Sequence, residues 1–285
     1  MAFQTVDWPE GLQVCPEALT GRIVCGDSRT ALREVPEGCV GLVVTSPPYG
    51  VGKQYDDPVL AHDGLLELIR AVVVECYRVL EPGERIAINV ANLWRKPWVP
   101  FSAHVAELLC ELGFVLRGEI VWVKTSEAAR SSCRWGSWAS ATNPCLRDTT
   151  ERIVVASKGS LGRMPDKRTR KVLGLPWEDT ILAEDFREWS VDCWRMRPAV
   201  ATRVGHPAPF PVELPRRLIK FYTFRGDVVL DPFAGSGTSC VAAVQTDRRW
   251  LGIEQDPGYV ELARTHIEKQ TLPLALDWQL DQGVG

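Results

Sequence analysis

Short apolar runs alternate with stretches of helical periodicity along most of the chain. Runs rich in β-branched and aliphatic residues, typical of buried strands, occupy 22–25, 41–45, 85–90, 115–124, 227–231 and 250–254. Helices are predicted over 28–35, 64–80, 101–112, 211–221, 236–246 and 257–270. This alternation predicts an α/β fold, with a parallel sheet covered by helices on both faces.

The alternation stops in the middle of the chain. Between 125 and 205 only a stretch at about 151–157 has the pattern of a strand, and the remainder is rich in Ser, Arg and Trp. For the tryptophans of this segment, packing in a core and stacking on nucleic-acid bases are both open. We interpret 127–205 as an inserted recognition region that returns one strand to the core sheet. The other predicted segments are an N-terminal arm (1–21), two core halves (22–126 and 206–270) and a C-terminal tail (271–285).

Composition narrows the class of protein. Hydrophobic residues make up 45% of the sequence and charged residues 24%, and there is neither a run of eighteen apolar residues nor a basic-then-apolar N-terminus. We therefore expect a cytoplasmic protein with no membrane partner. The nine cysteines include no C-x-x-C pair and the four histidines are dispersed, so we expect reduced thiols and no metal site.

Charge is distributed unevenly. The net charge of −3 excludes a uniformly basic coat, but residues 126–203 hold 14 Lys and Arg against 10 Asp and Glu. The excess is largest at 163–171, where a solvated loop and a phosphate-contacting loop are equally consistent with the pattern. The candidate phosphate ligands of this run are Arg163, Lys167, Arg168, Arg170 and Lys171.

One predicted strand ends abruptly. The run Val43-Val44-Thr45 continues into Ser46-Pro47-Pro48-Tyr49-Gly50, so a buried strand is followed by a hydroxyl, two prolines, an aromatic ring and a glycine. The prolines fix φ and carry no N–H, which stiffens the chain and leaves carbonyl groups as acceptors. The pattern indicates a binding site, although a proline-terminated strand with a surface Tyr would look the same.

A second predicted strand, 227–231, runs into the glycine-rich turn Pro232-Phe233-Ala234-Gly235-Ser236-Gly237-Thr238 and then into a helix. Glycines let the backbone approach a nucleotide-like ligand closely. A P-loop is excluded because no Lys precedes Thr238. A dinucleotide fingerprint is weakened because Cys240 stands at its third glycine position.

Two carboxylates define the ligand further. Glu254 ends the following strand, where it can accept hydrogen bonds from both hydroxyls of a ribose, unless it only caps a helix or faces solvent. Asp231, beside the glycine turn, would repel a pyrophosphate and attract an ammonium group. S-adenosylmethionine carries a ribose and an ammonium group and has no phosphate, so it fits both carboxylates.

Together the two motifs resemble those of the amino-methyltransferases of DNA, in the permuted order called the β class, over about 22–126 and 145–270. The resemblance implies a Rossmann-like S-adenosylmethionine-dependent methyltransferase sheet of seven mostly parallel strands, circularly permuted, with an inserted target-recognition region. It implies S-adenosylmethionine as the cofactor and double-stranded DNA as the partner. It also leads us to expect a homodimer, and a cognate restriction endonuclease that acts on the same site without a stable complex.

By the same resemblance, Asp27 contacts the adenine of the cofactor, Phe233 and Gly235 surround its methionine part, and Glu254 binds its ribose. The turn adds further expected cofactor-binding residues, namely Asp231, Ser236, Gly237 and Thr238. Phe210 lies in His206-Pro207-Ala208-Pro209-Phe210-Pro211, which resembles the family segment that closes over the methionine moiety, although a rigid linker explains it too. The segment 143–148, which leads to Glu151, also resembles members of this class.

The expected catalytic motif consists of Ser46, Pro47, Pro48 and Tyr49. An exocyclic amine on an aromatic base is a poor nucleophile because its lone pair is conjugated with the ring. Hydrogen bonds to the Ser46 hydroxyl and the Pro47 carbonyl would localise that lone pair for in-line attack, and Tyr49 would stack on the extruded base. Ser in the first position favours cytosine N4 as the acceptor.

Other functions stay open from the sequence: adenine-N6 transfer on the same fold, a non-catalytic DNA-binding regulator and an NAD-dependent enzyme. Methylation at cytosine C5 would require a thiolate just after a proline in the catalytic motif. Cys145 follows Pro144 but lies outside that motif, so we interpret it as structural. In the recognition region, the expected DNA contacts besides the basic run are Arg134, Trp135 and Trp138, for which packing against the sheet edge is the alternative.

Overall fold

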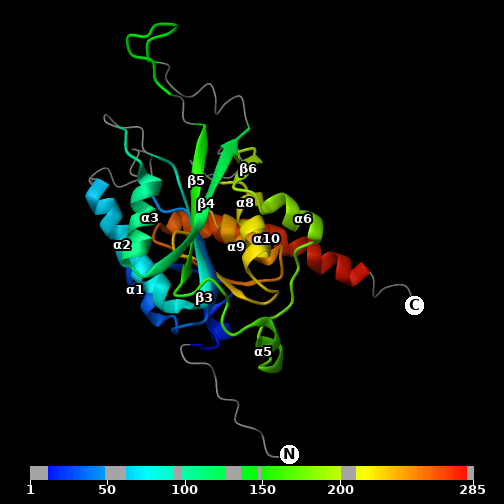
Figure 1. Cartoon of the computed structure of the whole chain (residues 1–285). Coiled ribbons are helices and arrows are strands. Elements are labelled where there is room, and N and C mark those ends of the chain that lie inside the picture. Colours follow the sequence, from blue (N-terminus) through cyan, green and yellow to red (C-terminus); the bar gives the residue numbers. More distant parts are fainter. Residues whose placement is uncertain are drawn as a thin grey trace, which may run out of the picture.

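The computed structural model describes residues 12–48, 62–92, 98–125, 136–146, 149–199 and 210–280, and within them the chain forms one eight-stranded sheet (Figure 1). The strands are β1 (Arg22–Cys25), β2 (Val40–Thr45), β3 (Leu80–Val90), β4 (Phe114–Lys124), β5 (Thr150–Lys158), β6 (Cys193–Met196), β7 (Val228–Asp231) and β8 (Arg249–Glu254). The helices are α1 (Ser28–Ala31), α2 (His62–Val79), α3 (Phe101–Glu111), α5 (Lys167–Val172), α6 (Ala183–Trp189), α8 (Glu213–Tyr222), α9 (Thr238–Val244) and α10 (Pro257–Leu280), with short 3-10 turns η1 (Glu17–Leu19) and η2 (Leu32–Glu34).

The strand order is β1-β8-β7-β2-β3-β5-β4-β6. The neighbouring pairs are parallel except where β5 lies antiparallel between β3 and β4. The predicted α/β fold with a mostly parallel sheet is therefore confirmed, and the strand predicted at about 151–157 does return to the core sheet. The crossover from β2 leads to β3 on one side, while the crossover from β7 leads to β8 on the other.

Alternation along the buried strands sorts the core into two layers. In β2, Val43 packs into the cluster formed with α2 and α3, whereas Leu42 and Val44 pack into the cluster formed with α8, α9 and α10. Successive side chains of a strand point to opposite faces, so a continuously apolar strand serves both layers. All six residues of β2 are buried, as expected for a central strand.

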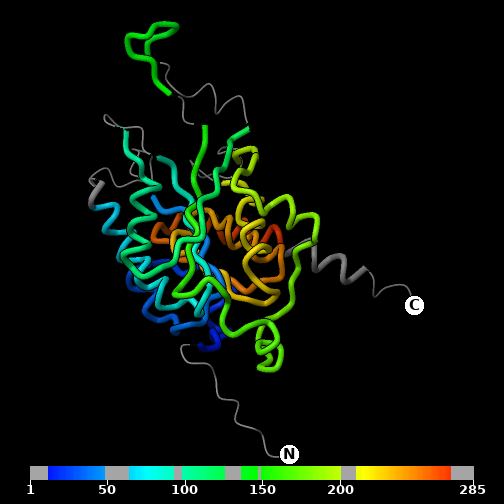
Figure 2. Tube along the Cα trace, in the orientation of Figure 1, coloured from blue at the N-terminus to red at the C-terminus, as the bar shows by residue number. Residues whose placement is uncertain are grey.

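The middle of the chain differs most from the prediction. Figure 2 shows 149–199 running down along β5, around α5 at the bottom of the view, and up again past α6 to β6. The sheet therefore has one strand more than the seven expected, because four-residue β6 is too short for its alternation to be recognised. Trp194 and Met196 of β6 are buried against the sheet, where β6 pairs with the carboxyl end of β4.

Two other boundaries also differ. Helix α10 extends to Leu280, so the segment 271–280 is helical rather than an irregular tail. Helix α2 ends at Val79 and β3 begins at Leu80, so the strand starts five residues before the predicted strand at 85–90. No helix in the described part of the chain is both long and apolar enough to span a membrane.

Candidate active site

Two motifs far apart in the sequence meet at the carboxyl edge of the sheet. Strands β2 and β7 lie side by side in parallel, with Val43 opposite Leu230. The Thr45 hydroxyl donates a hydrogen bond to Asp231 Oδ1 at 2.7 Å, which joins the strand before the proline motif to the strand before the glycine turn. The crossovers from these strands diverge here, and ligands of open α/β sheets bind in the crevice at such a switch point.

The glycine turn has a conformation that only glycine adopts easily. Gly235 and Gly237 have φ values of +50° and +78°. A Cβ on Gly237 would also lie 2.9 Å from the Cβ of Ala263 on α10, so the second glycine is needed for close packing as well. The Phe233 N–H donates to Asp231 Oδ1 at 3.1 Å, which folds the turn back over the end of β7.

Glu254 and Asp27 lie next to this turn. Gly235 N–H donates to Glu254 Oε2 at 2.8 Å and Asp256 N–H donates to Oε1 at 2.9 Å, while Gly26 N–H donates to the Glu254 carbonyl at 2.9 Å. The structure thus brings the predicted adenine, ribose and methionine residues to one edge. The Asp27 carboxylate accepts a hydrogen bond from Arg29 N–H and forms an ion pair with the Arg29 guanidinium, which lowers the Asp27 pKa.

Ser28, next in sequence, ties this region to the turn, because its hydroxyl donates to the Pro232 carbonyl. Ser236 and Gly237 lie in the turn and Thr238 is the first residue of α9, and contact of these three residues with the cofactor stays a prediction. Phe210 is half-buried and packs against the α8, α9 and α10 layer, while 206–209 lie outside the described residues.

Asp231 is the electrostatic centre of the site. Only 2% of its surface is exposed, and burial raises its pKa to about 6, while hydrogen bonds to the carboxylate oppose the shift. No Lys or Arg among the described residues forms an ion pair with it. A buried carboxylate without a cationic partner, beside a glycine turn, fits a ligand with an ammonium group. The residues present therefore fit S-adenosylmethionine.

A series of hydrogen-bonded polar residues begins at the proline motif, and sequence reasoning did not predict it. The Ser46 hydroxyl donates to the main-chain carbonyl of Asn89 at 3.1 Å, and the side-chain Nδ2 of Asn89 donates to Glu151 Oε2 at 2.6 Å. Lys124 Nζ lies 2.5 Å from Glu151 Oε1. Asn89 is a polar residue in an otherwise apolar buried run at the end of β3, and that break in the pattern was the available signal. Pro47 is buried and Pro48 half-buried, whereas Tyr49 lies outside the described residues.

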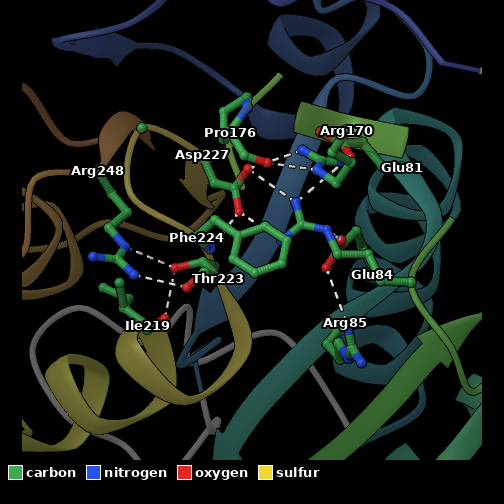
Figure 3. Close-up of polar contacts among 12 residues, drawn as sticks. Glu81, Glu84, Arg85, Arg170, Pro176, Ile219, Thr223, Phe224, Asp227 and Arg248 are labelled. Carbon is green, nitrogen blue, oxygen red and sulfur yellow. Dashed lines mark hydrogen bonds and ion pairs between the residues drawn. The ribbon is translucent and has the colours of Figure 1, made fainter. Parts of the chain in front are cut away.

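The basic run does not form the surface that was predicted. Figure 3 shows Arg170 enclosed between Glu81 and Asp227, and it is fully buried, with Nη1 2.6 Å from Glu81 Oε2. Arg163 pairs with Asp227 at 2.8 Å and with Glu84. These two guanidinium groups neutralise internal carboxylates, so the prediction that they contact DNA is wrong.

The other cations of the run, Lys167, Arg168 and Lys171, are exposed on α5. Arg170 attaches α5 to Glu81 near the start of β3 and to Asp227 before β7, at the amino edge of the sheet. Leu80, next to Glu81, pairs with Val40 at the amino end of β2, whereas Asn89 lies near the carboxyl end of β3. Helix α5 thus lies at the amino edge of the sheet, at the bottom of Figure 1, whereas Ser46 follows the carboxyl end of β2. Contact of the α5 cations with DNA stays a prediction.

Two tryptophans of the middle segment, Trp189 and Trp194, are buried core residues, as is Trp122 in β4. Trp138 is 71% exposed, in a loop closed by the Gly136 to Pro144 bridge. Arg134 and Trp135 lie outside the described residues, so DNA contact by these two and by Trp138 also stays a prediction. Among the residues with described side chains, no three His, Cys, Asp or Glu gather as a metal site would require.

A mostly parallel sheet with a glycine turn and a proline motif at its switch point is the arrangement of an α/β methyltransferase. A family model described as "DNA methylase", for the N6/N4 methyltransferases, matches residues 40–265. The chain belongs to this family of DNA methylases. The match includes both motifs and the whole segment between them.

Individual relatives and structures agree with this family. The Type II methyltransferase M.MjaI of Methanocaldococcus jannaschii is 26% identical, covering 91% of this chain and 95% of the relative. The DNA adenine methyltransferase YhdJ of Escherichia coli is 27% identical, covering 86% and 82%.

Among solved structures, TTHA0409, a putative DNA modification methylase from Thermus thermophilus complexed with S-adenosylmethionine, is 31% identical with a TM-score of 0.69, covering 87% and 93%. The cytosine-N4-specific PvuII DNA methyltransferase shares the fold at 20% identity, with a TM-score of 0.64 and coverage of 87% and 89%.

Proposed function

We propose that this DNA methyltransferase methylates the N4 amine of cytosine in duplex DNA, by direct attack of the amine after the base is extruded. The methyl donor is S-adenosylmethionine, which TTHA0409 also binds. When bound, the cofactor supplies an electrophilic methyl group on a sulfonium. The residues that would hold it are Asp27, Phe210, Asp231, Phe233, Gly235, Ser236, Gly237, Thr238 and Glu254.

The observation that carries the proposal is the hydrogen bond from Ser46 to the Asn89 carbonyl. A hydroxyl has one proton, and this bond uses it, so Ser46 Oγ can form any further hydrogen bond only as an acceptor. The Pro47 carbonyl is likewise an acceptor. Two acceptors placed together suit the two N–H groups of an exocyclic amine, whose lone pair they would localise on nitrogen.

Orientation supplies much of the rate in such a transfer, because holding nucleophile and electrophile in line is worth roughly 7–11 kcal/mol. Extruding the base costs a few kcal/mol, which stacking and backbone contacts must offset. In the proposal Tyr49 stacks on the extruded base, and Trp138, Trp135 and Arg134 contact the duplex. These roles come from the sequence motif and the exposure of Trp138.

The choice of base rests on Ser46, since D-P-P-Y is the commoner form of the motif for adenine. Relatives of both kinds exist: YhdJ is named an adenine methyltransferase and the PvuII enzyme is cytosine-N4-specific. Adenine N6 is therefore the alternative. Because M.MjaI is named a Type II methyltransferase, we place the protein in a restriction-modification system. An endonuclease that recognises the same site is the further partner in this proposal. Formation of a homodimer is a separate part of it.

The test is to incubate the protein with duplex DNA and S-adenosylmethionine labelled in its methyl group, and then to digest the DNA to nucleosides. We expect label in N4-methylcytosine. Label only in N6-methyladenine would overturn the choice of base, and absence of transfer to any DNA would overturn the function.

A Ser46→Ala variant should lower kcat about 100-fold, or about 2.7 kcal/mol, because one of the two acceptors is lost. Cys145→Ser is the matched control. It should keep full activity, since direct attack by an amine needs no thiolate; loss of activity would favour C5 chemistry.

A further inference from the structure

We propose that Glu151, held by Lys124, is a positioning residue that fixes Asn89 and, through Asn89, the hydroxyl of Ser46. The inference rests on the proposed function, because the group that it positions is the proposed acceptor of the amine. Glu151, Lys124 and Asn89 belong neither to the proline motif nor to the glycine turn.

The contacts form a continuous path across three strands. Ser46 follows β2, Asn89 is in β3, and Glu151 is in β5, which runs antiparallel to β3. Asn89 lies one pair from the end of the β3–β5 ladder, opposite Ile153, and its side-chain amide reaches diagonally to Glu151. Asn89 is only 3% exposed, so its side chain has little room to change rotamer.

Charge makes the middle of the path rigid. The Glu151 carboxylate accepts the Asn89 amide on one oxygen and Lys124 on the other, so each oxygen has a strong donor. Lys124 also lies over the Trp122 ring at 5.3 Å, which limits where its ammonium can go. The side chain that anchors Asn89 is thus itself held from the neighbouring strand β4.

The consequence for Ser46 concerns its proton. The acceptor in Asn89 is its main-chain carbonyl, so while the end of β3 is held the hydroxyl proton of Ser46 points at that carbonyl and Ser46 Oγ stays an acceptor. If the Asn89 side chain loses its anchor and the end of β3 shifts, the hydroxyl can rotate and offer its proton where the amine needs an acceptor. A displacement of about 1 Å near reacting groups can cost on the order of 100-fold in rate. The effect should fall on kcat and leave binding of S-adenosylmethionine unchanged, because Asp231 and Glu254 are on other strands.

The first experiment compares Glu151→Ala with wild type by single-turnover methyl transfer and by calorimetric binding of S-adenosylmethionine. We expect the single-turnover rate constant of methyl transfer to fall about 10- to 100-fold, with an unchanged Kd for the cofactor. The control is Glu119→Ala, because Glu119 pairs with Arg152 across the same two strands at 3.2 Å but away from the edge. It should keep the wild-type rate constant, because it removes a salt bridge between the same strands without removing a contact of Asn89 or Ser46.

The second experiment uses Asn89→Asp, which places two carboxylates together beside Lys124, with Arg152 contacting the Glu151 carbonyl. Without an amide donor between them the two carboxylates repel each other, so the methyl-transfer rate constant of Asn89→Asp should fall about 10- to 100-fold, as in Glu151→Ala. Adding Glu151→Gln restores an amide-to-carboxylate bond in the reverse direction, so the double variant should recover activity.

Each outcome separates the two hypotheses. If wild type methylates DNA while Glu151→Ala keeps its kcat, or while the double variant is no better than Asn89→Asp, Glu151 has no positioning role and the proposed function stands. If wild type transfers no methyl group to DNA, the proposed function is wrong and the positioning role falls with it.

Discussion

Polar clusters lie at both edges of the same sheet, and they differ in how their charges are matched. At the amino edge, Arg170 is enclosed between Glu81 and Asp227 (Figure 3), and Arg163 pairs with Glu84 and Asp227. At the carboxyl edge, Asp231 is as deeply buried as those carboxylates, but among the described residues its partners are neutral donors.

This difference separates a structural cluster from a ligand site. The amino-edge cluster is closed: Arg163 also lies over the Phe224 ring at 4.4 Å, and Arg170 donates to the Pro176 carbonyl. It fastens the chain after β5 to the starts of β3 and β7. The carboxyl edge keeps a buried charge that a bound cation could neutralise. The comparison teaches that a buried carboxylate without an ion-pair partner, rather than the presence of charge alone, indicates a ligand site.

The largest effect is expected at the closed edge. Arg170→Ala should lower the free energy of unfolding by about 3–5 kcal/mol, because Glu81 and Asp227 lose a buried partner. Chemical denaturation would measure the loss. Arg168→Ala, on the exposed side of the same helix, is the matched control and should change stability by less than about 0.5 kcal/mol.

Binding of S-adenosylmethionine by the folded fraction of Arg170→Ala should match wild type, since the cluster is at the other edge. Equal stability of Arg170→Ala and Arg168→Ala would show that the cluster contributes nothing to folding. The contrast between the two edges would then disappear.

At the carboxyl edge, removing the buried charge should stabilise the protein rather than destabilise it. The folded-state pKa of Asp231, about 6, is above the unfolded value of 3.8, so the folded protein binds this proton more strongly. The contribution of Asp231 is therefore favourable at low pH and is lost as the pH rises from about 4 to about 6, at a cost of up to about 3 kcal/mol. Asp231→Asn keeps a neutral acceptor for Thr45 at every pH.

We therefore expect Asp231→Asn to be more stable than wild type at pH 7.5 by up to about 3 kcal/mol, with the difference shrinking towards pH 4. Urea denaturation at several pH values would measure it. The same variant should bind S-adenosylmethionine more weakly, because the ammonium group loses its carboxylate. Parallel pH dependences for the two proteins would show that burial of this carboxylate has no energetic cost.

The sequence alone was enough for the sheet and for the two motifs, because both depend on local patterns. Continuous apolar runs such as 41–45 appeared as buried strands, and each motif stands at the end of such a run. Their juxtaposition followed from a parallel sheet, in which carboxyl ends share one edge. The pairing of Thr45 with Asp231 was not predicted, because it depends on which two strands are neighbours.

Burial of individual charged residues was the least predictable feature. Arg168 and Arg170 are two positions apart in one basic run, yet one is exposed and the other fully buried. Asp166 caps α5, and this fixes which side of the helix Arg170 occupies. The partners of Arg170, Glu81 and Asp227, are 89 and 57 residues away in the sequence, so no local sequence pattern could predict these contacts. Asn89 escaped notice for the same reason, since its role depends on Glu151 across the sheet.

The smallest expected effect tests whether α5 belongs to the DNA surface at all. The sequence predicts phosphate contacts for Lys167, Arg168 and Lys171. Their place at the amino edge, opposite Ser46, argues against contact with a duplex whose target base reaches that serine.

We expect the variant with all three residues replaced by Ala to leave the slope of the logarithm of the DNA-binding constant against the logarithm of the salt concentration unchanged. Each lost phosphate contact would reduce the steepness of this slope by about 1. Stability should change by less than about 1 kcal/mol, since the Lys167 ion pair with Asp179 is exposed. Arg134→Ala is the comparison variant, because the recognition region predicts a contact there. A slope reduced by two or three units in the α5 variant would mean that DNA extends to both edges of the sheet.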